Sequence, residues 1–197
     1  MREMIKMVVV LVVLSSLSGG LLGALKNTTE ERIDNQVLKF VKGPAIENIL
    51  KGADNDPVAD RFSLTVGEKE NNFFVGVFDG TPKAVAFEAF AGGYGGDLGV
   101  MVAVNVKTDE IMGISVTTHN ETPGIGATVE TDSDFKNQFI GKSAAAAYKV
   151  KDDGGDITAM SGATVTSRAV CTAVRRAGDI YEKAKSQIKD QVNNFTG

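Results

Sequence analysis

The chain of 197 residues has little of several residue types that build functional sites: no tryptophan, one cysteine (Cys171), one histidine (His119) and four prolines. A single cysteine excludes a disulfide within the chain, and with one histidine it excludes a metal site made of several Cys and His ligands. The net charge is −4, and no stripe of Lys and Arg alternates with aromatic residues. We therefore expect no nucleic acid among its partners.

What the chain does have is a hydrophobic content of 43% and 22 glycines. This composition is sufficient for one turn-rich domain with its own core and a short additional segment. No internal repeat and no long flexible linker divides the sequence into smaller parts.

Charge is absent from residues 7–25, a run of nineteen residues dominated by Val, Leu and Gly. A helix of this length crosses the hydrocarbon core of a bilayer. Arg2 and Lys6 precede the run, and this positive leading side predicts a cytoplasmic N-terminus and an extracytoplasmic domain. The alternative is a cleaved signal peptide with its apolar region at residues 7–14, but the apolar run continues well beyond the length of such a region.

We therefore divide the chain into a cytoplasmic N-terminus with a transmembrane anchor, residues 1–26, and an extracytoplasmic domain, residues 27–197. Residues 28–31, Thr-Thr-Glu-Glu, resemble a capping box and predict a helix that Gly43-Pro44 ends. A second, short helix is expected over residues 46–50.

Apolar runs bounded by turn residues predict strands over residues 73–78, 84–90, 100–106 and 111–117. The last two alternate apolar and polar residues and form a predicted hairpin. Further along, we expect a short helix over residues 134–140 and a strand or extended segment over residues 143–150. Helices at both ends of a mainly antiparallel sheet make the expected fold class α+β.

A long C-terminal helix is predicted because apolar residues recur every three or four positions from Val165 to Ile188. It begins within Ser161-Gly162-Ala163-Thr164-Val165-Thr166-Ser167. At such an N-terminus the unpaired N–H groups and the positive end of the helix dipole attract anions, so a phosphate fits there. The residues alone leave two interpretations open: Ser161 or Thr164 caps the helix with its hydroxyl, or the segment holds a phosphate.

Three glycine-rich loops, residues 92–96, 123–126 and 154–162, interrupt the predicted elements. Loops of this kind often carry binding sites, although each one alone predicts no more than a turn. We expect His119 to be a hydrogen-bonding residue rather than an acid–base group. Cys171 lies on the apolar side of the last helix and is expected to be a buried, inert thiol.

The segment Ser161-Gly162-Ala163-Thr164 resembles the Ser/Thr-Gly-Ala-Thr motif of FMN-carrying subunits in two related membrane complexes. Two more segments recur in that family in the same order: Gly93-Tyr94-Gly95-Gly96, and the run His-Asn-Glu-Thr-Pro-Gly-Ile-Gly at residues 119–126. The complexes are the Rnf electron transport complex (ferredoxin:NAD oxidoreductase), through its G subunit, and the sodium-translocating NADH:quinone reductase, through its C subunit. The length of the chain favours the Rnf complex and its G subunit.

The resemblance implies an FMN that is covalently linked to the Thr164 hydroxyl through a phosphoester and that a flavin transferase installs from FAD. It also implies a wider set of cofactor-binding residues: Ser161, Gly162, Ala163, Val165, Thr166, Tyr94, Gly95, Glu121, Thr122, Gly124, Ile125 and Gly126. It implies neither a catalytic acid or base nor a metal site. The family motif often has an acidic residue three positions before its Ser or Thr, where this chain has Thr158.

By the same resemblance, we expect a single-pass protein of the inner (cytoplasmic) membrane with its domain on the periplasmic side. It would relay electrons between redox centres of an ion-translocating Rnf complex, in contact with the other subunits of that complex. The equivalent subunit of the quinone reductase is one alternative. Others are a membrane-anchored FMN-binding or sensory domain that passes no electrons onward, and a structural domain in which Thr164 is only a cap.

Overall fold

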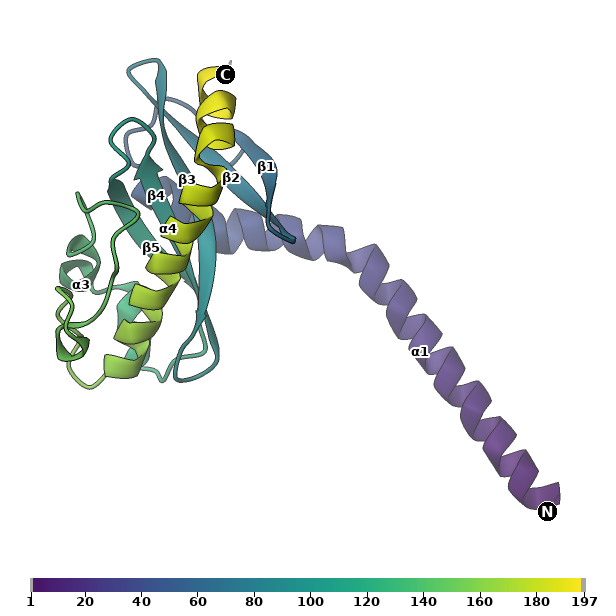
Figure 1. Ribbon diagram of the computed structural model, residues 1–197. Helices are drawn as coiled ribbons and strands as arrows, with labels where there is room; N and C mark the ends of the chain where they lie inside the picture. Colours follow the sequence, from purple (N-terminus) through teal and green to yellow (C-terminus); the bar gives the residue numbers. More distant parts are fainter. Residues whose placement is uncertain (1, 196–197) are drawn as a thin grey trace. The chain divides into compact units, whose positions relative to one another are not determined.

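The computed structural model of the protein describes residues 2–195 (Figure 1). The chain separates into two compact units, Met1–Phe40 and Val41–Gly197. The first unit contains α1, Arg2–Val37, and its portion Arg2–Thr29 is long and apolar enough to cross a membrane. The Val and Leu side chains of that portion are exposed, as a lipid-facing helix requires.

The predicted capping box at residues 28–31 is wrong, because α1 is helical on both sides of it. The Thr28 hydroxyl donates to the carbonyls of Ala24 and Leu25, each 3.0 Å away. This bond back to the preceding turn is the one that Thr makes inside a helix. Propagation of the helix from the apolar run therefore overrides the cap signal.

The dipeptide Gly43-Pro44 begins a helix instead of ending one, contrary to the sequence-based expectation. A stretch of π-helix, Leu38–Lys42, is followed directly by α2, Gly43–Ile49, with the proline in its first turn. Proline is tolerated there because first-turn N–H groups have no partner within the helix. The short helix predicted over residues 46–50 is confirmed, with an earlier start.

A five-stranded antiparallel sheet forms the centre of the second unit, in the order β1-β2-β3-β4-β5. Its strands are β1 Arg61–Val66, β2 Lys69–Phe78, β3 Thr81–Gly92, β4 Asp97–Asn105 and β5 Ile111–Thr118. The four predicted strands are confirmed. The sequence analysis missed β1, although Phe62, Leu64 and Val66 alternate there with polar residues.

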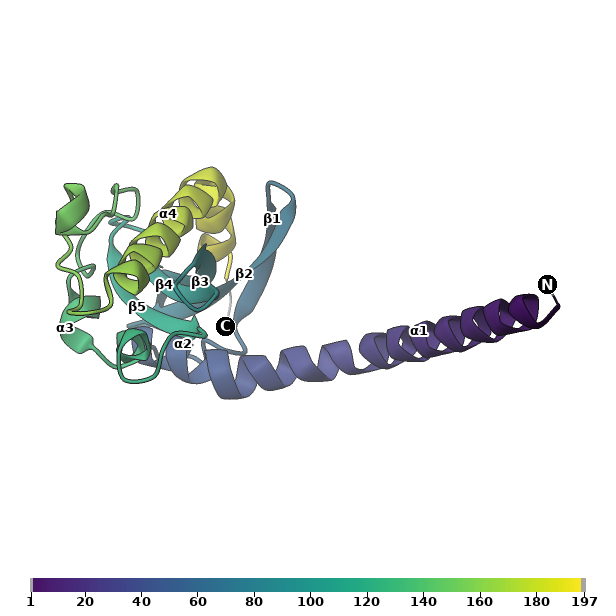
Figure 2. The same ribbon diagram turned by 90° about the horizontal axis from the view of Figure 1, so that it is seen from below.

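The predicted C-terminal helix is confirmed as α4, Thr164–Asn193, which lies across one face of the sheet, with α2 against the opposite face (Figure 2). Because both faces are covered, the middle of β3 is buried on both sides. Phe87 of β3 stacks on Tyr181 of α4, with ring centroids 6.4 Å apart. Together these elements confirm the expected α+β fold.

The segment between β5 and α4 is irregular and contains the 3₁₀ helix η2, Gly126–Glu130, the helix α3, Ser133–Asn137, and the 3₁₀ turn η3, Lys151–Asp153. The short helix predicted over residues 134–140 is thus confirmed, with a shorter extent. Residues 143–150 form no strand, only single bridges from Ser143 to Glu110 and from Val150 to Ile157.

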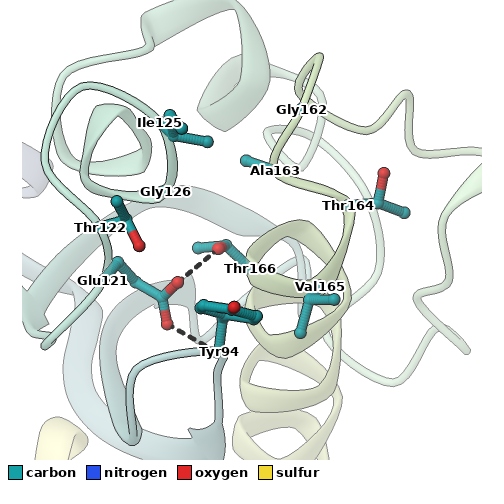
Figure 3. A pocket seen from close by; sticks show the side chains of 10 residues that line it. All are labelled: Tyr94, Glu121, Thr122, Ile125, Gly126, Gly162, Ala163, Thr164, Val165 and Thr166. Carbon is teal, nitrogen blue, oxygen red and sulfur yellow. Dashed lines mark hydrogen bonds between the residues drawn. The ribbon is translucent and has the colours of Figure 1, made fainter.

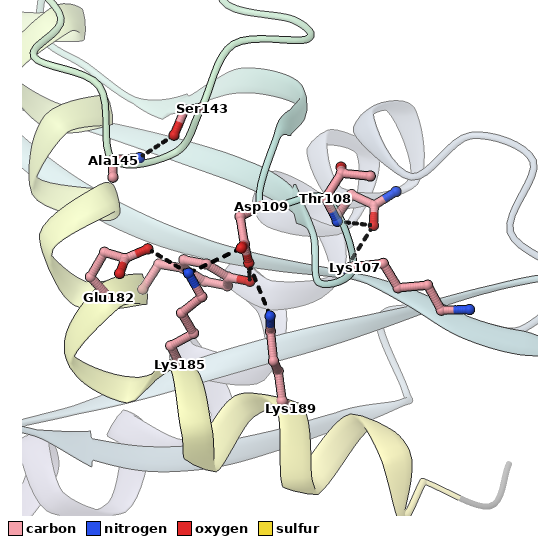
Figure 4. A network of polar contacts seen from close by, with 10 residues as sticks. Lys107, Thr108, Asp109, Ser143, Ala145, Glu182, Lys185 and Lys189 are labelled. Carbon is pink, nitrogen blue, oxygen red and sulfur yellow. Dashed lines mark hydrogen bonds and ion pairs between the residues drawn. The ribbon is translucent and has the colours of Figure 1, made fainter.

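The C-terminal half of α4 is fastened to the β4–β5 turn through Asp109 (Figure 4). This carboxylate accepts the Tyr181 hydroxyl at 2.7 Å, and the ammonium groups of Lys185 and Lys189 lie 3.0 and 3.3 Å from it. Burial alone would raise the pKa of the Asp109 carboxyl, but these three donors together hold the pKa below its usual range. The Asp109 carbonyl also accepts the N–H of Ala144 at 2.9 Å.

Candidate functional site

The three glycine-rich segments of the sequence meet at the N-terminal end of α4 and enclose a cavity of about 540 Å³ (Figure 3). The cavity is lined by Tyr94, Glu121, Thr122, Ile125, Gly126, Gly162, Ala163, Thr164, Val165 and Thr166. All ten belong to the thirteen cofactor-binding residues inferred from the sequence, whereas Ser161, Gly95 and Gly124 are not in the lining. The volume lies within the usual range of small-molecule and cofactor sites.

Glu121 joins two of these loops to the start of α4. Its side chain is buried, and Oε1 accepts the backbone N–H groups of Tyr94 and Gly95 at 2.9 and 3.2 Å. Oε2 accepts the Thr166 hydroxyl at 2.6 Å. One carboxylate therefore connects the loop after β3, the loop after β5 and the first turn of α4.

Glycine is required where these loops approach one another most closely. A Cβ at Gly126 would stand 2.7 Å from Glu121 Oε2 and 2.9 Å from the Thr166 hydroxyl. A Cβ at Gly95 would overlap the carbonyl of Asn120. Gly95 thus shapes the site through backbone contact, although its atoms do not line the cavity.

The start of α4 has no side-chain cap. The N-cap residue is Ala163, and neither Ser161 nor Thr164 bonds the first-turn N–H groups, so the capping interpretation is wrong. The Ser167 hydroxyl holds the turn from inside, because it accepts the Met160 N–H and donates to the Ala163 carbonyl, both at 3.0 Å. The sequence analysis missed this residue, whose signal was a Ser four positions after Ala163.

The two threonine hydroxyls at this helix start have different environments. Thr166 is buried, and its hydroxyl is committed to Glu121. Thr164 is partly exposed and lines the cavity, and Figure 3 shows its side chain turned away from Glu121. Within the described part of the chain, the Thr164 hydroxyl makes no side-chain hydrogen bond. Of the two, Thr164 has the hydroxyl that a reagent can reach.

Apolar side chains surround the mouth of the cavity. Tyr94, Ile125 and Val165 all line it, yet they are 74%, 51% and 47% exposed. Large apolar side chains gathered around a concave site are typical of surfaces that a ligand or partner covers. A flat aromatic ring system is a suitable occupant, because Tyr94 offers an aromatic face and the other two offer aliphatic walls.

A phosphate in this cavity would have to be held by backbone groups. Among the described residues of the lining, Glu121 has the only charged side chain. Arg168, one turn into α4, is directed elsewhere, with Nε 2.7 Å and Nη2 2.8 Å from the two carboxylate oxygens of Asp153. The donors at hand are the uncapped N–H groups of the first turn of α4, at the positive end of a 30-residue helix. These features fit a phosphate joined to a ring system.

His119 and Cys171 behave as expected from the sequence. His119 Nδ1 accepts the N–H of Glu121 at 3.3 Å, and Nε2 lies 3.5 Å from the Glu130 carboxylate, so the imidazole supports the loop. Cys171 is buried in α4, and burial raises the pKa of its thiol to about 11. The thiolate that reacts as a nucleophile is therefore scarce at neutral pH.

Comparison with known proteins matches residues 93–179 to the FMN-binding domain. This match spans the Gly93–Gly96 loop, the loop after β5 and the first half of α4, so the fold and the site define an FMN-binding domain. Solved structures of the C subunit of Na⁺-translocating NADH-quinone reductase resemble the chain as well. The Parabacteroides distasonis protein is 27% identical with a TM-score of 0.53, covering 60% of this chain and 64% of that one. The Shewanella oneidensis protein, at 23% identity and a TM-score of 0.53 over 71% and 72% of the two chains, shares the fold.

Curated relatives named as the G subunit of an ion-translocating oxidoreductase complex match over most of the chain. The Escherichia coli K12 protein is 32% identical over 181 residues, 87% of both chains. The Shewanella oneidensis protein is 29% identical over 205 residues, 98% of this chain and 96% of that one. The Cereibacter sphaeroides protein is 36% identical over 141 residues, and the match covers 68% of this chain and 64% of the relative. The chain belongs to this family, the G subunits of ion-translocating oxidoreductase complexes.

The family resemblance inferred from the sequence motifs is thus confirmed, as is FMN as the cofactor of the domain. Together with the apolar helix Arg2–Thr29, membership of this family makes the chain a single-pass membrane protein.

Proposed function

We propose that this protein is the electron-carrier subunit of an Rnf-type ion-translocating complex and that its FMN is joined to Thr164 through a phosphoester. The observation that carries the attachment site is the contrast between the two threonines. Thr164 lines the cavity and its hydroxyl makes no side-chain hydrogen bond within the described chain, whereas the Thr166 hydroxyl is buried against Glu121.

The chain contributes binding and orientation. FMN, when bound, supplies the capacity to accept and release electrons one or two at a time. The first turn of α4 offers backbone N–H groups to the phosphate, and the side chains of Tyr94, Ile125 and Val165 offer apolar contact to the ring. Electron transfer requires proximity and a suitable potential, so no general acid or base is needed from the cavity walls.

Attachment requires a flavin transferase that uses FAD as donor. The Thr164 hydroxyl oxygen attacks the phosphorus on the FMN side of the FAD pyrophosphate, and a new oxygen–phosphorus bond forms. The pyrophosphate bond breaks, AMP leaves with its electron pair, and the hydroxyl proton passes to solvent. Nothing is oxidised or reduced in this step. The exposure of the loop before α4, with Ser161 and Gly162 at the surface, supports access by such an enzyme.

The domain is proposed to face the periplasm, in contact with the other subunits of the complex. The support is the positive leading side of the apolar helix, with Arg2 and Lys6 ahead of its uncharged run. A covalent link suits this location, because a flavin lost outside the cytoplasm is not readily replaced.

A role as the C subunit of a sodium-translocating quinone reductase is the second candidate, and the 27% identity to a solved member supports it. The relatives at 32% and 36% identity favour the G subunit of an ion-translocating oxidoreductase. A flavin domain that relays no electrons is a third candidate. Measuring flavin reduction in the assembled membrane complex, with the complex's own electron donor, separates it from the other two.

The attachment site is tested by two matched Thr→Val substitutions in the full chain, each co-expressed with a flavin transferase. We expect Thr164→Val to lose all covalent flavin, seen as in-gel fluorescence at the size of this protein. Thr166→Val should keep its fluorescence, and peptide mass spectrometry should place the flavin on Thr164. Absence of covalent flavin in the unsubstituted chain, or fluorescence in Thr164→Val, would refute the assignment.

A further inference from the structure

The buried carboxylate of Glu121 has a second role besides connecting the loops around the cavity. We infer that its negative charge lowers the reduction potential of a flavin held in the cavity, an inference that rests on the proposed function. Three donors converge on this side chain: two backbone N–H groups and the Thr166 hydroxyl. A carboxyl group that only accepts hydrogen bonds is in its ionised form.

A second carboxylate, that of the partly buried Glu88 in β3, has its charge compensated by a cation. Its side chain is 9% exposed, and the Lys42 ammonium lies 2.6 Å away. Glu88 also accepts the Thr117 hydroxyl. Glu121 is 6% exposed, and none of the ion pairs formed over residues 2–195 involves it. Its charge is balanced by dipoles alone.

His119 does not supply the missing positive charge. It forms no ion pair with the Glu121 carboxylate and is not among the described residues that line the cavity, and its Nε2 faces the Glu130 carboxylate instead. The described wall of the cavity therefore has a net charge of −1, located on the carboxylate of Glu121.

This charge acts on any flavin that is reduced inside the cavity. Each electron added to the ring increases the negative charge in the cavity by one unit until a proton follows. Like charges repel more strongly in a partly buried site than in water. The carboxylate of Glu121 therefore disfavours the reduced form and shifts the midpoint potential to a more negative value.

The substitution Glu121→Gln isolates the charge from the architecture. A glutamine has the same shape, its Oε1 can accept both backbone N–H groups, and its Nε2 can donate to the Thr166 hydroxyl. The experiment uses the full chain in detergent, flavinylated by a co-expressed transferase and titrated with dithionite under anaerobic conditions. We expect a midpoint potential shifted in the positive direction in the molecules that carry flavin.

Two further variants test whether the shift in midpoint potential is specific to the charge of Glu121. Glu130→Gln is the same chemical change at a carboxylate that is 62% exposed, and solvent screening should leave its potential at the unsubstituted value. Thr166→Val keeps the charge of Glu121 but removes one donor that balances it, so its potential should shift in the negative direction. If Glu121 served only as a structural support, Glu121→Gln would leave the potential unchanged, because the glutamine keeps the same hydrogen bonds.

The titration follows only the molecules that carry flavin, so partial occupancy does not obscure the result. An unshifted potential in Glu121→Gln overturns the inference, as does a positive shift in Thr166→Val. Failure of the proposed function has a different signature, because the unsubstituted chain would then carry no covalent flavin on Thr164.

Discussion

The two ends of α4 are held differently. In its C-terminal half, side chains form a hydrogen bond and ion pairs with the rest of the domain, whereas its first turn has no side-chain cap. Lys185 and Lys189 converge on Asp109 (Figure 4), and the Tyr181 hydroxyl donates to the same carboxylate. At the other end, Ala163 stands where Ser, Thr, Asp or Asn would bond the free N–H groups.

The difference indicates which end stabilises the domain and which end is kept available for a ligand. A cap at Ala163 would satisfy the helix and compete with a bound phosphate for the same N–H groups. Functional sites often break local rules of stability that the rest of the fold obeys. Substitutions at the two ends should therefore affect different measurements.

The largest effect is expected from Tyr181→Ala. The Tyr181 ring is fully buried and stacks on Phe87, so its removal should lower the free energy of unfolding by about 3–5 kcal/mol. Denaturant unfolding of the full chain in detergent measures this, and flavin per folded molecule should stay constant. As a control, Tyr181→Phe keeps the ring and should lose about 1 kcal/mol. Equal losses in the two variants would contradict the role given to the ring.

The Asp109→Asn substitution should destabilise the domain by about 1–2 kcal/mol at neutral pH, because a partly exposed charge with three donors is removed. The folded-state pKa of Asp109 is lowered, so its contribution is present above the unfolded pKa of about 3.9 and is lost as the pH falls through the folded value. Unfolding measured from about pH 7 to about pH 3 should show the two proteins converge. A difference that persists unchanged at the acidic end would argue against the ion-pair network.

Much of the C-terminal end of α4 could be predicted from the sequence, since a period of three to four residues specifies a helix and its buried face. The long-range partner of that face could not. Asp109 lies 72 residues from Tyr181, and its position beneath α4 depends on how the β4–β5 hairpin packs. Local patterns contain no information about such a pairing.

At the site, the sequence motifs predicted which residues gather around the cavity, but not how they do so. Glu121 was inferred to bind the cofactor. The structure adds that its carboxylate accepts hydrogen bonds from the Thr166 hydroxyl and the Tyr94 N–H. The capping interpretation is wrong, because Ser167, inside the helix, makes the side-chain hydrogen bonds that hold the turn before α4. Capping rules consider the residues before a helix, so they overlook a side chain that bonds back from its first turn.

The smallest expected effect is that of Gly162→Ala, at the uncapped end. Gly162 has a φ of 74°, a conformation that costs other residues about 1 kcal/mol, while the nearest side-chain atom to an added Cβ, in Ile125, is 3.9 Å away. Gly141→Ala is the matched control, because Gly141 has a φ of 75° and open space around it, outside the cavity lining.

Both alanine variants should therefore lose the same free energy of unfolding, since the backbone strain is the same. Only Gly162→Ala should also lower the fraction of chains that carry covalent flavin, because relief of the strain moves the turn that presents Thr164. Quantifying flavin fluorescence per folded protein in the two variants tests this. If Gly141→Ala lowers that fraction equally, the effect reflects stability alone, and the first turn of α4 is no more sensitive than a distant loop.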